Sequence, residues 1–208
     1  IVTCIDGAHA PGMVSLNLDA IRADFYTGNC HKWMCAPKGS GFLSVSEPWV
    51  DRVVPNVISW GTGPFTENTV GNRLIDGNTW LGTQSPCSYL SVPATITFLR
   101  DNDWDRVRCD CHALLTDALR EVNELIGFAP LYPSESGVSQ MGISELPSSW
   151  DPARLKTFLY DRFRVEVPII RWKERNFVRV SCQGYNDNED VCALVAGLEE
   201  FKGKESSK

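Results

Sequence analysis

The first part of the chain alternates short apolar runs with polar turns. Runs of this length that are bounded by turn residues predict β-strands. Farther along, apolar residues recur every three or four positions, which is typical of amphipathic helices, and such a mixture predicts an α/β protein. We expect strands at residues 1–5, 23–27, 42–46, 55–59, 165–171 and 177–181. We expect helices at residues 88–99, 104–126, 152–162 and 188–201.

A polar break at residues 101–103 separates two regions of the chain. It is followed by residues 104–126, whose apolar positions fall on one helical face. We therefore expect one domain over residues 1–103 and a second over residues 104–208, which includes the linking helix.

Two helix starts carry capping signals. Asp151 can accept hydrogen bonds from the first free N–H groups, and Pro152 suits the first helical position. Ser88 is the candidate cap of the helix at 88–99. We expect residues 60–82 to be rich in loops, assign no helix or strand to the Pro/Ser-rich stretch 130–152, and expect a frayed end at residues 202–208.

Asp6 and Lys32 each follow one of the apolar runs. Two strands that end at the same edge of a sheet would bring this carboxylate and this amine to one crevice. The pair suits pyridoxal phosphate, because a carboxylate keeps the ring nitrogen protonated and a lysine amine forms a Schiff base with the aldehyde. Taken alone, each residue is also what an ordinary strand end or an exposed surface provides.

The residues around this pair match a known motif. The pattern D-x-A-[HQ], followed later by H-K, is met by Asp6, Ala8, His9, His31 and Lys32. Through them the chain resembles the class-V aminotransferase family of fold-type I pyridoxal-phosphate enzymes. The wording DGAHAPG, TGNCHKW and APKGSGFL is similar to the isopenicillin N epimerase-like branch. The resemblance implies an α/β fold: the later half of the large domain, with a mostly parallel sheet, and a small C-terminal α/β domain.

The resemblance also implies a role for each residue, with pyridoxal 5'-phosphate as the cofactor. Asp6 would pair with the ring nitrogen, and His9 would hydrogen-bond the phenolic oxygen. Lys32 would hold the cofactor as a Schiff base and then act as the base at the α-carbon of an amino-acid substrate. Asn29 and His31 would contact the phosphate. Cysteine desulfurases generally carry glutamine at the position of His9, so His9 points away from that group.

Two further landmarks recur in the order that the family shows. Thr83, after a glycine, would reach the phosphate of the partner's cofactor in a homodimer, although Gln84 departs from the acid that often follows. Arg179 begins the pattern R-x-S-x-x-x-Y-N and would grip the substrate α-carboxylate, because its planar fork donates two parallel hydrogen bonds. Arg171 and Arg175 lie in a charged turn and are expected to be solvated.

The cysteines bear on the reaction. Cysteine desulfurases of this class need a mobile-loop cysteine ahead of the carboxylate-binding arginine, and no cysteine lies between Cys111 and Cys182. A desulfurase that forms a persulfide is therefore disfavoured. Reprotonation of the α-carbon on its opposite face would give an epimerase, and loss of a β-substituent would give a carbon–sulfur lyase such as a cysteine desulfhydrase. A non-catalytic interaction module of the same fold is a third alternative.

The composition of the chain bears on which classes of partner it can bind. The chain has 208 residues, 43% of them hydrophobic, and a formal net charge of −6. It is long enough to bury a core, and its negative charge argues against nucleic acid or an anionic membrane surface as a partner. No apolar run is long enough to span a bilayer, so we expect a cytoplasmic enzyme. Cys109 and Cys111 would face nearly opposite sides of a helix, and no metal site is expected.

The chain begins inside an apolar run and without methionine. Enzymes of the family that it resembles carry a phosphate loop and a ring-stacking residue upstream of the aspartate, and neither has a counterpart here. We therefore expect these residues to be the C-terminal part of a longer protein and to be inactive on their own.

Overall fold

The computed structural model describes residues 1–58, 60–62, 70–79, 82–132 and 137–206. The chain divides into two compact units, Ile1–Asn102 and Asp103–Lys208. We call them the N-terminal and the C-terminal unit and describe each by itself.

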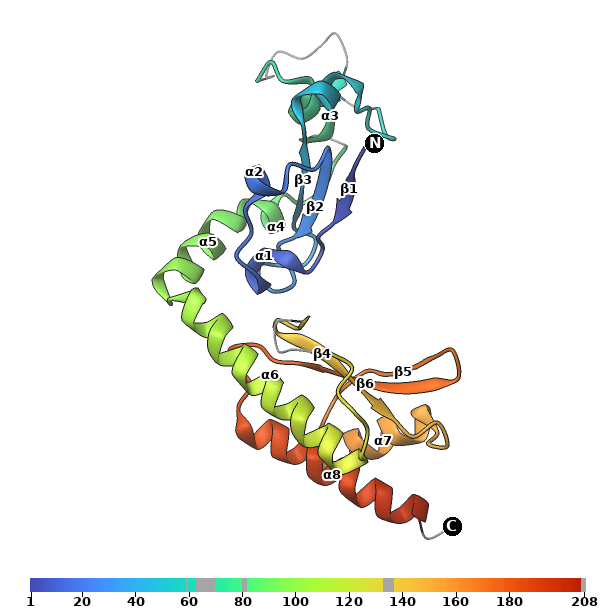
Figure 1. The fold of residues 1–208 in the computed structure, drawn as a ribbon. Helices are drawn as coiled ribbons and strands as arrows, with labels where there is room; N and C mark the ends of the chain where they lie inside the picture. The colour runs from blue at the N-terminus through green and yellow to red at the C-terminus, as the bar shows by residue number, and fades with distance from the viewer. Residues whose placement is uncertain (59, 63–69, 80–81, 133–136, 207–208) are drawn as a thin grey trace. The chain divides into compact units, whose positions relative to one another are not determined.

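The N-terminal unit is built on three strands in the order β1-β2-β3 (Figure 1). β1 (Cys4–Asp6) runs parallel to β2 (Phe25–Asn29), and β2 runs antiparallel to β3 (Gly41–Val45). Tyr26 is buried on β2 and stacks on Phe42 of β3, with the ring centroids 6.2 Å apart. Backbone pairing therefore joins β2 to both other strands, and side-chain stacking adds to its contact with β3.

The strand directions differ in part from the mostly parallel sheet that the sequence suggested. Residues 30–40 connect β2 to β3 by turns and contain no crossover helix, so β3 returns antiparallel to β2. The strand expected at 55–59 is absent from residues 55–58, where Pro55 has no N–H to donate to a ladder. Residue 59 lies outside the described residues.

The other described elements of this unit are short helical segments. The helix expected at 88–99 is divided at Ser91, where Pro93 in the first turn of the second segment cannot donate a hydrogen bond back to the first. The described segments are α1 (Ala10–Met13), α2 (Leu18–Ile21), η1 (Glu47–Arg52), η2 (Trp60–Thr62), α3 (Arg73–Thr79), α4 (Cys87–Leu90) and α5 (Val92–Asp101).

Asp24 ties the starting end of β2 to its neighbours. Its Oδ2 accepts hydrogen bonds from the backbone N and the Oγ1 of Thr3, at 2.8 and 3.0 Å. Its Oδ1 accepts from Nε1 of Trp49 at 2.9 Å. The N–H of Thr3 is the largest cause of a pKa of Asp24 below its usual 3.8. Asp24 thus links the start of β1, β2 and η1 through one charged carboxylate.

We expect Asp24→Asn to destabilise the protein at neutral pH and to have less effect in acid. A carboxylate whose pKa is lowered by folding stabilises above its unfolded pKa, and this contribution is lost as the pH falls through the folded value, below 3.8. Thermal unfolding followed by circular dichroism at pH 7 and pH 3 measures this, with exposed Asp19→Asn as the control. An equal difference at both pH values would contradict the assigned role.

The C-terminal unit places helices against an antiparallel sheet of order β4-β6-β5. α6 contacts β4 and β6, α7 contacts β5, and α8 packs on both helices. Figure 1 shows the long α6 and α8 side by side. The elements are α6 (Trp104–Ile126), β4 (Met141–Leu146), α7 (Pro152–Phe163), β5 (Ile169–Trp172), β6 (Arg175–Ser181) and α8 (Asn188–Ser206).

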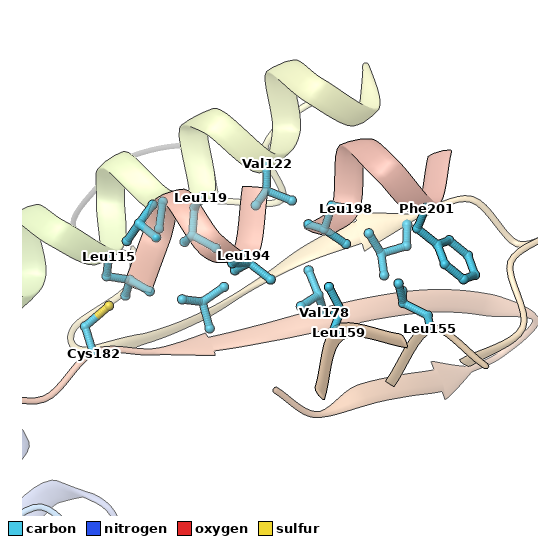
Figure 2. Close-up of a cluster of buried hydrophobic side chains, with 14 of the residues drawn as sticks. Leu115, Leu119, Val122, Leu155, Leu159, Val178, Cys182, Leu194, Leu198 and Phe201 are labelled. Atoms are coloured by element: carbon cyan, nitrogen blue, oxygen red, sulfur yellow. The ribbon is translucent and has the colours of Figure 1, made fainter. Parts of the chain in front are cut away.

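A single apolar cluster lies between these helices and the sheet (Figure 2). Leu115 and Val122 of α6, Leu159 of α7, Val178 of β6 and Leu198 of α8 are all fully buried. Burying a leucine or valine side chain contributes about 1.5–3 kcal/mol relative to leaving it exposed. Every large element of the unit therefore contributes to one core.

The ends of several elements differ from the sequence expectation. β4 lies in the Pro/Ser-rich stretch 130–152, in which no strand was expected from the sequence, and residues 133–136 of that stretch are outside the described residues. β5 begins at Ile169 because Pro168 has no N–H, although its carbonyl accepts from the N–H of Arg179 at 3.0 Å. α8 continues to Ser206, so residues 202–206 are helical rather than frayed.

The predicted helix caps had mixed outcomes. Asp151 caps α7 as predicted, accepting from the N–H of Arg154 at 2.7 Å. Ser88 does not cap α4, since its hydroxyl donates to the carbonyl of Lys38 at 2.7 Å. Asp103 precedes α6 in a left-handed conformation and its side chain makes no capping hydrogen bond.

Candidate active site

The carboxyl ends of β1 and β2 lie side by side. The parallel register aligns Asp6 with Thr27, and the N–H of Gly7 donates to the carbonyl of Thr27 at 2.9 Å. Oδ1 of Asp6 accepts from the N–H of Ala8 at 3.0 Å, and Oδ2 has no hydrogen-bond partner among the described residues. Asp6 is exposed. One oxygen of a carboxylate is therefore fixed and the other is open to a ligand.

The loop after β1 packs tightly on the turn after β2. Gly12 has φ of +84°, and a Cβ there would lie 2.5 Å from the carbonyl carbon of Trp33. Only glycine allows this backbone conformation and this close approach. His9, half-buried, precedes α1 on this loop. The packing therefore brings the segment that carries His9 next to the turn that carries Lys32.

Lys32 lies on the turn that leaves β2 and is exposed. Its carbonyl accepts from the N–H of Cys35 at 3.1 Å, and the carbonyl of Cys30 accepts from the N–H of Ala36 at 3.0 Å. Cys30 is buried beneath this turn, and burial raises the pKa of its thiol. The turn is closed by its own backbone, and the side chain of Lys32 is exposed on it.

His31 is anchored to the next turn by its ring. Its Nδ1 lies 2.6 Å from the carbonyl oxygen of Ser40, and Ser40 itself is 1% exposed. The hydroxyl of Ser88 tethers the same turn through the carbonyl of Lys38. Asn29 ends β2 and pairs with Gly41. The sequence did not single out Ser40 or Ser88 as a site residue, because both contacts are made to backbone carbonyls, that of Ser40 itself and that of Lys38.

Thr83 is exposed and follows Gly82, which has φ of +134°. The two preceding residues, 80 and 81, lie outside the described part of the chain. The structure thus brings Asp6, His9, Asn29, His31 and Lys32 to one edge of the N-terminal sheet and leaves Thr83 on a separate segment of the same unit.

Arg179 lies in the middle of β6, directly opposite Ile143 of β4. Its Nε is buried and has no hydrogen-bond partner among the residues that the structure describes. It is among the residues lining a cavity of about 330 Å³ between residues 163–168, the end of β6 and the start of α8. A buried donor without a partner is costly, so this guanidinium is suited to an added acceptor.

The two neighbouring arginines are engaged elsewhere. Arg175 makes a two-pronged contact with Glu145, with Nε donating to Oε1 at 2.8 Å. Arg171 donates to Oε2 of Glu174 at 2.7 Å. Both are exposed, in agreement with the prediction that they are solvated.

Four other features of the described residues bear on whether there is a second site: the cysteines of α6, possible metal ligands, a further cavity and the longer helices. Cys111 is buried and Cys109 exposed on α6, as the helical spacing predicted. In the described part of the chain no group of His, Cys, Asp and Glu could hold a metal ion. A larger cavity of about 600 Å³ lies between α6, residues 127–130, Tyr132 and Val138, and none of the predicted site residues is among those that line it. None of the described helices is both long and apolar enough to cross a membrane.

Comparison with known proteins decides the family. The family model for aminotransferase class-V matches residues 1–194. The chain belongs to the class-V aminotransferase family. It is 35% identical over 209 residues to an isopenicillin N epimerase of Amycolatopsis lactamdurans, covering 97% of this chain and 52% of that protein. It is 29% identical over 206 residues to a probable chloroplastic L-cysteine desulfhydrase of Arabidopsis thaliana, covering 91% of this chain and 42% of that protein.

The fold agrees with this family. An apo structure of a cysteine desulfurase from Thermococcus onnurineus matches with a TM-score of 0.76 and 21% identity, covering 97% of this chain and 53% of that one. This class-V chain therefore has the fold-type I architecture, as the sequence implied. The chain spans about half the length of the curated relatives that it matches.

Proposed function

We propose that the protein containing these residues is a pyridoxal-phosphate-dependent enzyme that acts at the α-carbon of an amino acid, as an epimerase-like member of its family. The cofactor of the class-V aminotransferases is pyridoxal 5'-phosphate. The observation that carries the proposal is the parallel pairing of β1 and β2, which brings Asp6 and the Lys32 turn to the same edge. In this proposal the N-terminal unit is part of the cofactor-binding domain and the C-terminal unit is the small domain.

The residues at this edge fit the cofactor. Asp6 has an open carboxylate oxygen for a protonated ring nitrogen, and the exposed amine of Lys32 is free to attach to an aldehyde. His9 would donate to the phenolic oxygen, and Asn29 and His31 would donate to the phosphate. When bound, pyridoxal phosphate supplies a ring that delocalises the charge left at the α-carbon when a proton departs.

The chain's own residues then divide the work. The Lys32 amine accepts the proton from the substrate α-carbon, which is general-base catalysis. Arg179 orients the substrate by donating two hydrogen bonds to its carboxylate, and its buried, unpartnered Nε supports this role. Asp6 holds a proton at the ring nitrogen. Thr83 reaches the phosphate in the partner's site of a homodimer.

A carbon–sulfur lyase is the second candidate function. The similarity to proteins named L-cysteine desulfhydrases, at 29 and 30% identity, favours it. Cys182, the first cysteine after Arg179, is not a candidate sulfur acceptor, because burial raises the pKa of its thiol to about 11, with Cys111 and Asp190 adding to the effect. A thiol that stays protonated at neutral pH is a poor sulfur acceptor.

The two reactions are separated by their products. With isopenicillin N, an epimerase inverts the α-carbon without releasing a product, which chiral chromatography detects. With L-cysteine, a lyase releases sulfide and pyruvate. Sulfide accompanied by alanine and a protein persulfide would instead restore the desulfurase. Neither change with either substrate would contradict the proposed function.

We expect Arg179→Ala to raise KM strongly and to leave cofactor absorbance unchanged. The substitution leaves the substrate carboxylate unpaired, a loss of about 2–5 kcal/mol for a desolvated pair, which corresponds to about 30-fold to 4,000-fold. Steady-state kinetics and an absorbance spectrum of the resting enzyme measure the two effects. Arg171→Ala, on exposed Arg171 paired with Glu174, is the matched control and should keep KM. A normal KM in Arg179→Ala would remove Arg179 from the substrate site.

A further inference from the structure

The ring of His31 has one nitrogen committed to the protein. A carbonyl oxygen only accepts hydrogen bonds, so the 2.6 Å contact between Nδ1 and the Ser40 carbonyl places a hydrogen on Nδ1. That carbonyl is held in place, because the Ser40 hydroxyl donates to the carbonyl of Pro37 at 2.8 Å and Ser88 tethers Lys38. The ring tautomer is therefore set by a fixed backbone group.

The other nitrogen, Nε2, is left for a ligand. It has no hydrogen-bond partner among the residues described. In a neutral ring with its hydrogen on Nδ1, Nε2 is an acceptor only. A phosphate dianion also has acceptors only, with a last pKa near 6 in a phosphate monoester. A neutral His31 ring and a dianionic phosphate therefore cannot form a hydrogen bond through Nε2, because neither group supplies a donor.

We propose that His31 binds the cofactor phosphate together with one extra proton, taken from the solvent buffer when the cofactor binds. The inference rests on the proposed function, in which His31 contacts the phosphate. The proton lies between Nε2 and a phosphate oxygen. The pair can be an imidazolium with a phosphate dianion or a neutral ring with a phosphate monoanion. Both arrangements contain the same number of protons, so one proton is taken up in either case.

Other titratable groups lie on the segments around His31. The loop after β1 carries Asp6 and His9, and the turn of His31 itself carries Cys30 and Lys32. Lys38 is on the next turn. The Lys32 amine must lose a proton to attach to an aldehyde, which gives the opposite pH dependence. Pyridoxal, which has the aldehyde and lacks the phosphate, cancels this contribution in a comparison.

The experiment measures the affinities of the protein for pyridoxal phosphate and for pyridoxal between pH 7 and 9 by absorbance titration. Uptake of one proton makes the ratio of the two affinities fall by about tenfold per pH unit in the wild type. His31→Gln, which can donate an amide N–H without a proton from solvent, should give a nearly constant ratio. His112→Gln is the matched control, since His112 makes the same kind of contact with the Ser139 carbonyl at 3.0 Å, in the C-terminal unit.

Each outcome has a defined meaning. Parallel profiles in the wild type and His31→Gln, with the cofactor bound, overturn the inference and leave the proposed function standing. No binding of either compound to the wild type contradicts the proposed function itself. If His31→Gln does not fold, calorimetry of the wild type in two buffers of different ionisation enthalpy counts the protons directly. One more proton taken up with pyridoxal phosphate than with pyridoxal supports the inference, and equal counts refute it.

Discussion

Lys32→Ala should lose nearly all turnover in the protein that contains this chain. The substitution removes the amine that we assign as both the attachment point and the base, and general acid–base catalysis alone contributes about 10²–10⁴-fold. The loss should therefore reach at least that range in kcat. Steady-state kinetics measure the loss in kcat, and incorporation of solvent deuterium at the substrate α-position measures the loss of proton exchange. Folding should be unaffected, because Lys32 is exposed and its turn is closed by backbone hydrogen bonds.

Lys38→Ala is the matched control. Lys38 is also exposed and lies on the next turn, where its backbone carbonyl rather than its amine is bound by Ser88. It should keep wild-type kinetics. Full turnover in Lys32→Ala, together with loss in Lys38→Ala, would reverse our assignment of the two lysines.

Asp6→Asn should leave the fold intact and slow α-proton exchange by about 10²–10³-fold, the range seen when one preorganised electrostatic contact is removed from an active site. Asparagine retains an oxygen that can accept from the N–H of Ala8, so the turn after β1 keeps its hydrogen bond. Its amide carries no charge and cannot hold a proton on the ring nitrogen. Deuterium incorporation at the α-carbon, measured at saturating substrate, reports the effect.

Asp19→Asn makes the same chemical change at an exposed position in the first turn of α2. It should exchange the α-proton at the wild-type rate. Wild-type exchange in Asp6→Asn would mean that Asp6 only caps the turn at Ala8.

The edge that carries the candidate site could be predicted from the sequence. Strands are expected at residues 1–5 and 23–27, and the structure has them at Cys4–Asp6 and Phe25–Asn29, each displaced toward its carboxyl end. The signal is direct because each strand coincides with a short apolar run that is followed by polar residues. The start of α7 could also be predicted, because an aspartate followed by a proline is a local capping signal.

β4 was missed for a physical reason. Its buried positions are Gly142, Ser144 and Leu146, so two of the three residues on its inner face are small or polar. A Cβ at position 142 would lie 2.6 Å from Cδ1 of Leu119, which shows why a small residue occupies this place against α6. Because the packing favours small or polar residues at these buried positions, the sequence of β4 lacks the alternation of apolar and polar residues from which a strand is predicted.

The hydrogen-bond partners of several polar side chains could not be predicted from the sequence. The contact of His31 with the Ser40 carbonyl is made to a backbone group, and its position depends on the path of the chain between β2 and β3. Asp24 could equally have been an exposed acid, and its bonds to Thr3 and Trp49 appear only once β1, β2 and η1 are assembled. Long-range partners of polar groups are set by topology, which local patterns do not encode.

The central claim is that the amine of Lys32 is the attachment point of the cofactor. Incubation with pyridoxal phosphate, reduction with borohydride and peptide mapping by mass spectrometry test it most directly. We predict a single pyridoxyl label on Lys32, absent from Lys32→Ala and unchanged in Lys38→Ala. A label on Lys38, or no label on the wild type, would contradict the account.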